Sequence, residues 1–318
     1  MQAIVVESGR VACREVPQPV PASGEALIQV LLAGVCGTDL EIVQGYGSFE
    51  GVLGHEFVGR VVKGPAALVG RRVVGEINCV CGRCDLCQGG LSAHCRRRTV
   101  LGIAGRPGAF AEYLTLPERN LLVVPDEVSD EEAVFTEPLA AAIQITRQVR
   151  IERRSQVAVL GTGRLGLLVA QVLARTGCRL TAIGRNPRTL GFLDRRRIRN
   201  LPIDSVRQWN DQDVVVDCTG SPEGFGLALR LVRPRGQLVL KTTCRAEAPT
   251  DLSSVVVNEV TVIGSRCGPM DEALNLLGRK EIDVTGMVTR VFPLREGVAA
   301  VTLAADPDHL KVLLKVGE

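Results

Sequence analysis

The chain has 318 residues, of which 46% are hydrophobic, 23% charged and only 3% aromatic, and its formal net charge is +3. This length exceeds what most single hydrophobic cores need, so we expect two domains. A small net charge and few aromatic side chains for base stacking argue against a nucleic-acid-binding protein.

The sequence contains no pattern typical of export or membrane insertion. Its first residues, MQAIVVESGR, lack a charged leader followed by an apolar run, and no apolar stretch reaches about 18 residues. We therefore expect a cytoplasmic protein that does not contact a membrane. Disulfides are rare in that reducing compartment, so we interpret clustered cysteines first as metal ligands.

The N-terminal part of the chain reads as a β-rich domain. Short runs rich in Val and Ile, separated by Gly and Pro, are typical of an antiparallel sheet or barrel. The predicted strands cover residues 2–7, 26–35, 57–62, 71–77 and 111–116. After them, residues 129–149 predict a helix that begins at Ser129 with an acidic first turn. Pro138 is expected to kink or divide this helix.

The next part alternates predicted strands and helices. A strand at 156–160, a glycine-rich turn, a helix at 165–177 and a strand at 179–183 form one strand–helix–strand unit. Residues 213–217, 222–232 and 237–240 continue the alternation, which predicts a doubly wound parallel sheet and an α/β fold class. We expect domains at 1–140 and 141–280, with residues 281–318 returning to the first domain.

Four cysteines in one short run have the spacing of a structural metal site. Cys81, Cys84, Cys87 and Cys95 follow the pattern C-x2-C-x2-C-x7-C, and Cys79 falls outside it. Four thiolates complete a tetrahedral shell and leave no position for a substrate, so we expect a structural zinc rather than a reactive centre. Unpaired thiols or a redox switch are the alternatives.

The turn GTGRLG has the features of a dinucleotide-binding site. Gly161, Gly163 and Gly166 lie between a predicted strand and a predicted helix, whose N-terminus attracts phosphate. We expect the residues of this turn and one residue beyond the strand at 213–217 to contact the cofactor; besides the three glycines they are Thr162, Arg164, Leu165 and Thr219.

The end of the next predicted strand favours NADP over NAD. An acidic residue there would bind the ribose 2′-hydroxyl of NAD, but the sequence has Gly184, followed by Arg185 and Arg188. Arginines without a nearby carboxylate suit the 2′-phosphate of NADP. The alternative is that both arginines are merely solvated and that NAD is used.

Two further motifs contain ligand types that zinc prefers. They are GVCGTDLE, with Cys36, and GVLGHEFVG, with His55. Taken alone, a buried Cys and a buried His would more often be core residues. Together with the glycine-rich turn and the cysteine run, however, these motifs resemble the zinc-containing medium-chain alcohol dehydrogenase family. The resemblance is nearest to its polyol, glucose and threonine dehydrogenase branches.

This resemblance implies a GroES-like β-barrel catalytic domain, a Rossmann dinucleotide-binding domain and two zinc ions per chain. The family's motifs place the catalytic zinc on Cys36, His55 and Glu137, with Glu56 as a fourth or alternating ligand. The structural zinc would be bound by the four spaced cysteines.

The resemblance also implies a set of catalytic roles. Asp39 matches the carboxylate that orients the ligand histidine, and Thr38 matches the hydroxyl that passes the substrate proton outward. Several branches have a histidine three residues beyond this hydroxyl, where the present chain has Glu41. Either Glu41 or water would then complete the proton path.

The implied function is interconversion of a small secondary alcohol, such as a polyol or sugar, and its carbonyl by hydride transfer to NADP. The resemblance also implies a homo-oligomer, either a dimer or a tetramer. Two alternatives stay open: a catalytically inactive nucleotide-binding or sensing protein of the same fold, and an NAD-linked threonine-type dehydrogenase.

Overall fold

The computed structural model describes residues 1–206, 210–241 and 251–317, and they form two compact units. Unit 1 contains residues 1–137 and 270–318, and unit 2 contains residues 138–269. The sequence placed these boundaries at 140 and 281. The later boundary differs because helix α9 (Met270–Gly278) packs against α3 (Asp130–Ala133) of unit 1, and Lys280 just beyond it pairs with Glu132.

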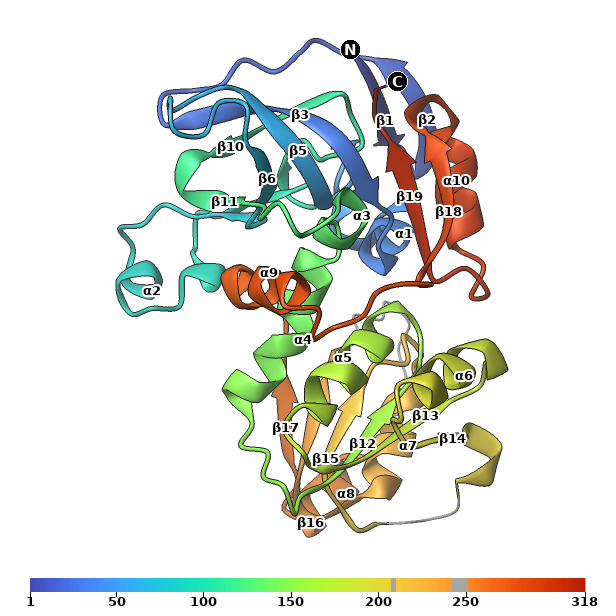
Figure 1. Ribbon diagram of the computed structural model, residues 1–318. Helices are drawn as coiled ribbons and strands as arrows, with labels where there is room; N and C mark the ends of the chain where they lie inside the picture. Colours follow the sequence, from blue (N-terminus) through green and yellow to red (C-terminus); the bar gives the residue numbers. More distant parts are fainter. Residues whose placement is uncertain (207–209, 242–250, 318) are drawn as a thin grey trace. The chain divides into compact units, whose positions relative to one another are not determined.

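Unit 1 is built on a mostly antiparallel sheet (Figure 1). Within the described residues this sheet has the strand order β11-β6-β5-β3-β19-β18, and β10 also pairs with β3. Its members are β3 (Glu25–Gly34), β5 (Glu56–Lys63), β6 (Arg72–Gly75), β10 (Tyr113–Pro117), β11 (Leu121–Val123), β18 (Val288–Pro293) and β19 (Lys311–Lys315). The C-terminal segment thus returns to the first sheet, and the β-rich reading of the N-terminal part is confirmed.

Smaller elements surround this sheet. They are β1 (Gln2–Glu7), β2 (Arg10–Glu15), α1 (Gly37–Val43), β4 (Gly51–Val52), β7 (Asn78–Cys79), α2 (Asp85–Gln88), β8 (Thr99–Leu101), β9 (Gly105–Arg106) and α10 (Gly297–Ala304). β2, β1 and β4 form one small sheet, and β7, β8 and β9 form another beside the cysteine run.

The helix expected at 129–149 is divided in two. Ser129 caps α3 with a capping box, as its sequence indicates, and α4 (Thr136–Gln148) begins after a short break. Pro138 lies in the first turn of α4, where a missing backbone N–H removes no helical hydrogen bond.

Unit 2 is a doubly wound α/β layer. Its described strands form a parallel sheet in the order β14-β13-β12-β15-β16-β17, the order of the Rossmann fold. They are β12 (Gln156–Leu160), β13 (Arg179–Gly184), β14 (Asn200–Pro202), β15 (Gln212–Asp217), β16 (Val232–Leu240) and β17 (Thr261–Gly264). The accompanying helices are α5 (Arg164–Ala174), α6 (Pro187–Arg195), α7 (Glu223–Leu231) and α8 (Leu252–Val257).

The central strands β12, β13 and β15 are nearly continuously buried, as expected for a parallel sheet between helices. Ala158, Leu160, Val215 and Leu238 are fully buried at its centre. No helix among the described residues combines the length and apolar character that crossing a membrane requires. The two-unit α/β architecture expected from the sequence is therefore confirmed.

Candidate active site and metal centres

The end of β3 and the start of β5 bring together, in unit 1, three side chains that could hold a metal ion. The two strands are antiparallel neighbours, with Gly34 opposite Glu56. Cys36 follows the end of β3, and His55 and Glu56 stand at the start of β5. Ligand atoms of Cys36, His55 and Glu56 consequently lie within 4.8 Å of one another.

Asp39 contacts both Cys36 and His55 of this group. It is fully buried on α1, and its Oδ2 accepts a hydrogen bond of 2.8 Å from the backbone N–H of Cys36, the N-cap of that helix. Its Oδ1 lies 3.2 Å from Nδ1 of His55. A carboxylate on Nδ1 leaves Nε2 of the imidazole to face a metal, the arrangement that metal-binding histidines commonly have.

The charges around His55 stabilise its positive form. Burial acts to lower the pKa of His55, but the Asp39 carboxylate and the Cys36 sulfur outweigh it, so the pKa lies well above its ordinary value. A divalent cation beside these anionic groups would take the place of that proton.

Glu56 has one oxygen paired and one unpaired. Its Oε2 forms a buried ion pair with Nζ of Lys311, whereas Oε1 has no hydrogen-bond partner among the described residues. Gly34 makes room for this carboxylate, because a Cβ at position 34 would lie 2.7 Å from Oε2. A sulfur, an imidazole nitrogen and an unpartnered buried carboxylate oxygen together fit a zinc ion.

The residues assigned from sequence to the catalytic zinc are only partly gathered here. Cys36, His55 and Glu56 form the group, and Glu137 is outside it. Glu137 is half-buried in the first turn of α4. Glu56, expected as a fourth or alternating ligand, is thus the carboxylate that the structure places with Cys36 and His55.

Both expected proton-relay residues lie on α1. The hydroxyl of Thr38 is 3.8 Å from the Cys36 sulfur, and Glu41 follows one turn further along the same helix. Both residues are half-buried, so both side chains have partial access to solvent.

The cysteine run folds around a common centre. Cys81, Cys84, Cys87 and Cys95 have sulfur atoms within 4.8 Å of one another, with separations of 3.5 Å for Cys84–Cys87 and for Cys81–Cys95. Cys79 is outside this group; it is buried on β7, where its sulfur accepts from the Asn120 side chain. Four sulfur atoms at these separations fit a closed tetrahedral zinc site.

Backbone N–H groups around the four sulfurs favour thiolates at two of them. Hydrogen bonds from the backbone of Arg83 lower the pKa of Cys81 to about 6, and those from Cys87 lower the pKa of Cys84. Desolvation raises the pKa of Cys87 to about 11, so that thiol would lose its proton on binding a metal.

The glycines of the turn after β12 serve different purposes. Gly161 has φ +90°, and a Cβ there would lie 2.6 Å from the carbonyl oxygen of Cys218. A Cβ at Gly166 would meet the carbonyl oxygen of Gly161 at 1.8 Å, so this glycine allows close packing of α5. A Cβ at Gly163, the N-cap of α5, would meet no other atom of the described residues within 4 Å, so the space beside it is open. Open space at a helix N-terminus is what a bound pyrophosphate requires.

The other residues expected to contact the cofactor, those after β13 and after β15, lie along the carboxyl edge of the sheet in unit 2. Gly184 ends β13, and Arg185 and Arg188 follow it with exposed side chains. Thr219 follows β15, its hydroxyl donating to Asp217 Oδ1 at 2.7 Å, and its Cα would lie 2.9 Å from a Cβ at Gly161. This edge, where strand ends meet helix starts, is the usual ligand-binding edge of the fold.

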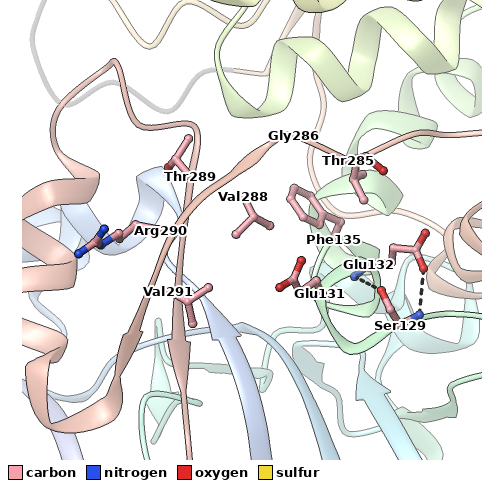
Figure 2. A pocket seen from close by; sticks show the side chains of 11 residues that line it. Ser129, Glu131, Glu132, Phe135, Thr285, Gly286, Val288, Thr289, Arg290 and Val291 are labelled. Atoms are coloured by element: carbon pink, nitrogen blue, oxygen red, sulfur yellow. Dashed lines mark hydrogen bonds between the residues drawn. The ribbon is translucent and has the colours of Figure 1, made fainter.

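A separate cavity of about 590 Å³ opens in unit 1 between α3, Phe135 just before α4, residues 284–286 and β18. Figure 2 shows Val288 facing Phe135 in it, with the hydrogen-bonded Ser129 and Glu132 at its margin. None of the metal-binding side chains lines this cavity.

Two residues of the site were missed by sequence reasoning. Lys311 could have been suspected as a charged residue inside the apolar run LKVLLKV, because it begins the buried part of β19 whereas Lys315 at the end of the strand is exposed. Gly34 carried no signal, because its role depends on the position of the Glu56 carboxylate in the neighbouring strand.

The sequence matches two protein families in succession. Residues 22–126 match the alcohol dehydrogenase GroES-like domain, and residues 165–279 match the zinc-binding dehydrogenase domain. A sorbitol dehydrogenase of Halalkalibacterium halodurans is 28% identical over 96% of both chains. An L-threonine 3-dehydrogenase of Streptomyces avermitilis is 30% identical over 99% of both chains.

Solved structures give the same relationship. Alcohol dehydrogenase TADH from Thermus sp. ATN1 superposes with a TM-score of 0.90 at 30% identity and covers the whole of both chains. A zinc-binding dehydrogenase of Sinorhizobium meliloti, solved with NADP, has a TM-score of 0.87 at 27% identity and covers 99% of this chain and 98% of its own. The protein therefore belongs to the zinc-containing medium-chain alcohol dehydrogenase family and is an oxidoreductase of the alcohol and polyol dehydrogenase kind.

Proposed function

We propose that the protein is a zinc-dependent, NADP-linked dehydrogenase that interconverts a secondary alcohol of a polyol, sugar or related compound and its carbonyl. The observation that carries this proposal is the group of Cys36, His55 and Glu56, with Asp39 holding the histidine. Such a donor set has no evident use in a protein that only binds nucleotides.

The catalytic zinc would be held by Cys36 and His55, with a carboxylate as third ligand. Glu56 is supported by its position and its unpartnered oxygen, and Glu137 by the family's motif. When bound, zinc supplies the Lewis acidity that makes a substrate hydroxyl more acidic, and the nicotinamide supplies the acceptor for the hydride.

The protein's own residues would orient the ligands and move the proton. Asp39 would orient His55 through its contact with Nδ1, and it accepts a hydrogen bond from the backbone N–H of Cys36. Thr38 accepts the proton of the substrate hydroxyl and transfers it toward solvent, either through Glu41 or through water. The substrate carbon loses a hydride in the same reaction, so one alcohol yields one carbonyl, one reduced nicotinamide and one proton.

The preference for NADP is supported by the residues after β13. Gly184 offers no carboxylate to the 2′-hydroxyl of NAD, and the exposed Arg185 and Arg188 offer two guanidinium groups to a 2′-phosphate. The solved relatives include proteins bound to NADP and to NADH, so relationship alone does not decide the cofactor.

The substrate class is supported by the relatives named for sorbitol and L-threonine, compounds that both carry a secondary hydroxyl. The NAD-linked threonine-type alternative rests on the second of these relatives. Arg185 and Arg188 favour the NADP-linked reading over it.

The test combines metal analysis with a screen of polyols, sugars and L-threonine against NADP and NAD, followed by nicotinamide absorbance. We expect about two zinc ions per chain and activity with NADP on a secondary alcohol. One zinc without activity would support an inactive nucleotide-binding protein, and activity with NAD on L-threonine alone would support the threonine-type alternative. Light scattering on the same preparation would distinguish a dimer from a tetramer.

A further inference from the structure

Gly184, the last residue of β13, is a glycine for a reason other than backbone strain. Its φ lies outside the left-handed region, so its backbone is open to every L-amino acid. It is buried, and it pairs with Pro202 of the neighbouring strand β14. What excludes a side chain here must therefore be the atoms around it.

Those atoms belong to Thr162 in the glycine-rich turn after β12. A Cβ at position 184 would lie 2.0 Å from Oγ1 of Thr162, 2.8 Å from its Cγ2 and 2.9 Å from its Cβ. Rotation about χ1 of Thr162 would move Oγ1 and Cγ2 but not Cβ. A side chain at 184 thus requires the turn or the strand to shift, which costs stability in a close-packed interior.

Thr162 is held in this position by a hydrogen-bonded chain. Thr162 is 4% exposed, and its hydroxyl lies 2.6 Å from the hydroxyl of Thr189 on α6. The Thr189 hydroxyl donates to the carbonyl oxygen of Asn186 at 2.9 Å, so its single proton is used there. Thr162 then donates to Thr189, which ties the turn to the first turn of α6.

Position 184 is where a carboxylate for the ribose hydroxyls of NAD would begin. We propose that Thr162 is a specificity-determining residue that acts by exclusion. Its side chain fills the space that an acidic residue at 184 needs, and the segment from Arg185 to Arg188 is left free of a carboxylate at its start. This inference rests on the proposed NADP-linked function, which it deepens by naming the residue that prevents an NAD-binding carboxylate at position 184.

The contact itself is tested on the protein without added cofactor, by thermal unfolding. Gly184→Ala is made in the parent and in Thr162→Val, Thr162→Ala and Thr162→Gly backgrounds. We expect Tm to fall by about 3–10 °C in the parent. Valine keeps the shape of threonine without its hydroxyl and should preserve this loss. Alanine should relieve part of it, and glycine nearly all. An equal loss in the parent and the Thr162→Gly background would overturn the proposal.

The consequence for selectivity is tested by titrating NADP and NAD without substrate, using calorimetry. Gly184→Asp alone should weaken both cofactors, because the clash distorts the turn. Compared with Thr162→Gly, the double variant Thr162→Gly/Gly184→Asp should bind NAD at least about 10-fold more tightly and NADP at least about 10-fold more weakly. A stable double variant with no gain in NAD affinity would overturn the exclusion role. A parent that already prefers NAD would contradict the proposed NADP linkage, while the unfolding series would still decide whether Thr162 excludes a side chain at 184.

Discussion

The ammonium group of Lys311 in β19 and the carboxylate of Glu56 at the start of β5 form an ion pair that is almost completely removed from solvent. Their side chains are 2% and 1% exposed. The same ammonium lies over the Phe135 ring, 5.5 Å from its centroid, so the cation contacts an aromatic face as well as the carboxylate. The pair fixes one oxygen of Glu56 beside Cys36 and His55.

Replacement of Lys311 by Met should destabilise the protein strongly. The variant leaves a buried carboxylate without its counter-charge, which typically costs about 3–5 kcal/mol in the free energy of unfolding. Lys280→Met is the matched control, because the Lys280–Glu132 pair is partly exposed and should cost at most about 1 kcal/mol. Urea denaturation measures both values. Equal small losses would show that the buried pair contributes nothing, and Glu56→Gln/Lys311→Met should recover part of the loss if the pairing is the cause.

Cys36→Ala should abolish turnover while leaving the second metal site intact. The variant removes a sulfur ligand from the group at the start of β5, and zinc per chain should fall from about two to about one. Cys13→Ala is the control, since Cys13 lies in β2 outside both groups of metal-binding side chains. Metal analysis and the alcohol assay measure the outcome. Full activity in Cys36→Ala would contradict its assignment as a ligand.

Cys84→Ala should instead remove the metal of the four-cysteine site and loosen the segment around it. It opens a four-sulfur site whose metal would hold the segment around α2 together, so we expect loss of one zinc and faster proteolysis within residues 78–106. Cys79→Ala provides a sharp control, because Cys79 lies next to the run but outside the group, and both zinc ions should stay bound. Unchanged zinc content and protease resistance in Cys84→Ala would rule out the closed site.

Glu132 should contribute to stability in a pH-dependent way. Partial burial acts to raise the pKa of Glu132, but Lys280 and the backbone N–H of Ser129 outweigh it, so the pKa lies below its ordinary value of 4.5. A depressed carboxyl pKa stabilises the fold above the ordinary value, and the contribution disappears as pH falls through the folded-state pKa.

Glu132→Gln should therefore cost up to about 1 kcal/mol at pH 7, and the difference from the parent should shrink below about pH 4.5. Glu131→Gln, on the same helix with an exposed side chain, is the control. Unfolding curves from pH 3 to 8 measure the effect. A difference that grows toward low pH would contradict the assigned direction.

Much of this protein can be predicted from local sequence. The Ser129 capping box, the strand at 156–160 with its glycine-rich turn, and the four spaced cysteines each depend on residues close in the chain. Within such short segments, residue type and spacing limit the geometry to a few possibilities. The family resemblance then places Cys36 and His55 in a shared site, and the structure brings their ligand atoms together.

Only the tertiary structure decides the contacts that depend on strand register and on the packing of distant segments. The sequence contains Glu56 and Lys311, but their pairing requires β3 to lie between β5 and β19 in the sheet. It also contains Thr162 and Gly184, but their contact requires β12 and β13 to be parallel neighbours with their ends aligned. Contacts of this kind depend on how strands distant in sequence are aligned in a sheet. A shift of one residue in register would turn each side chain to the opposite face and remove the contact.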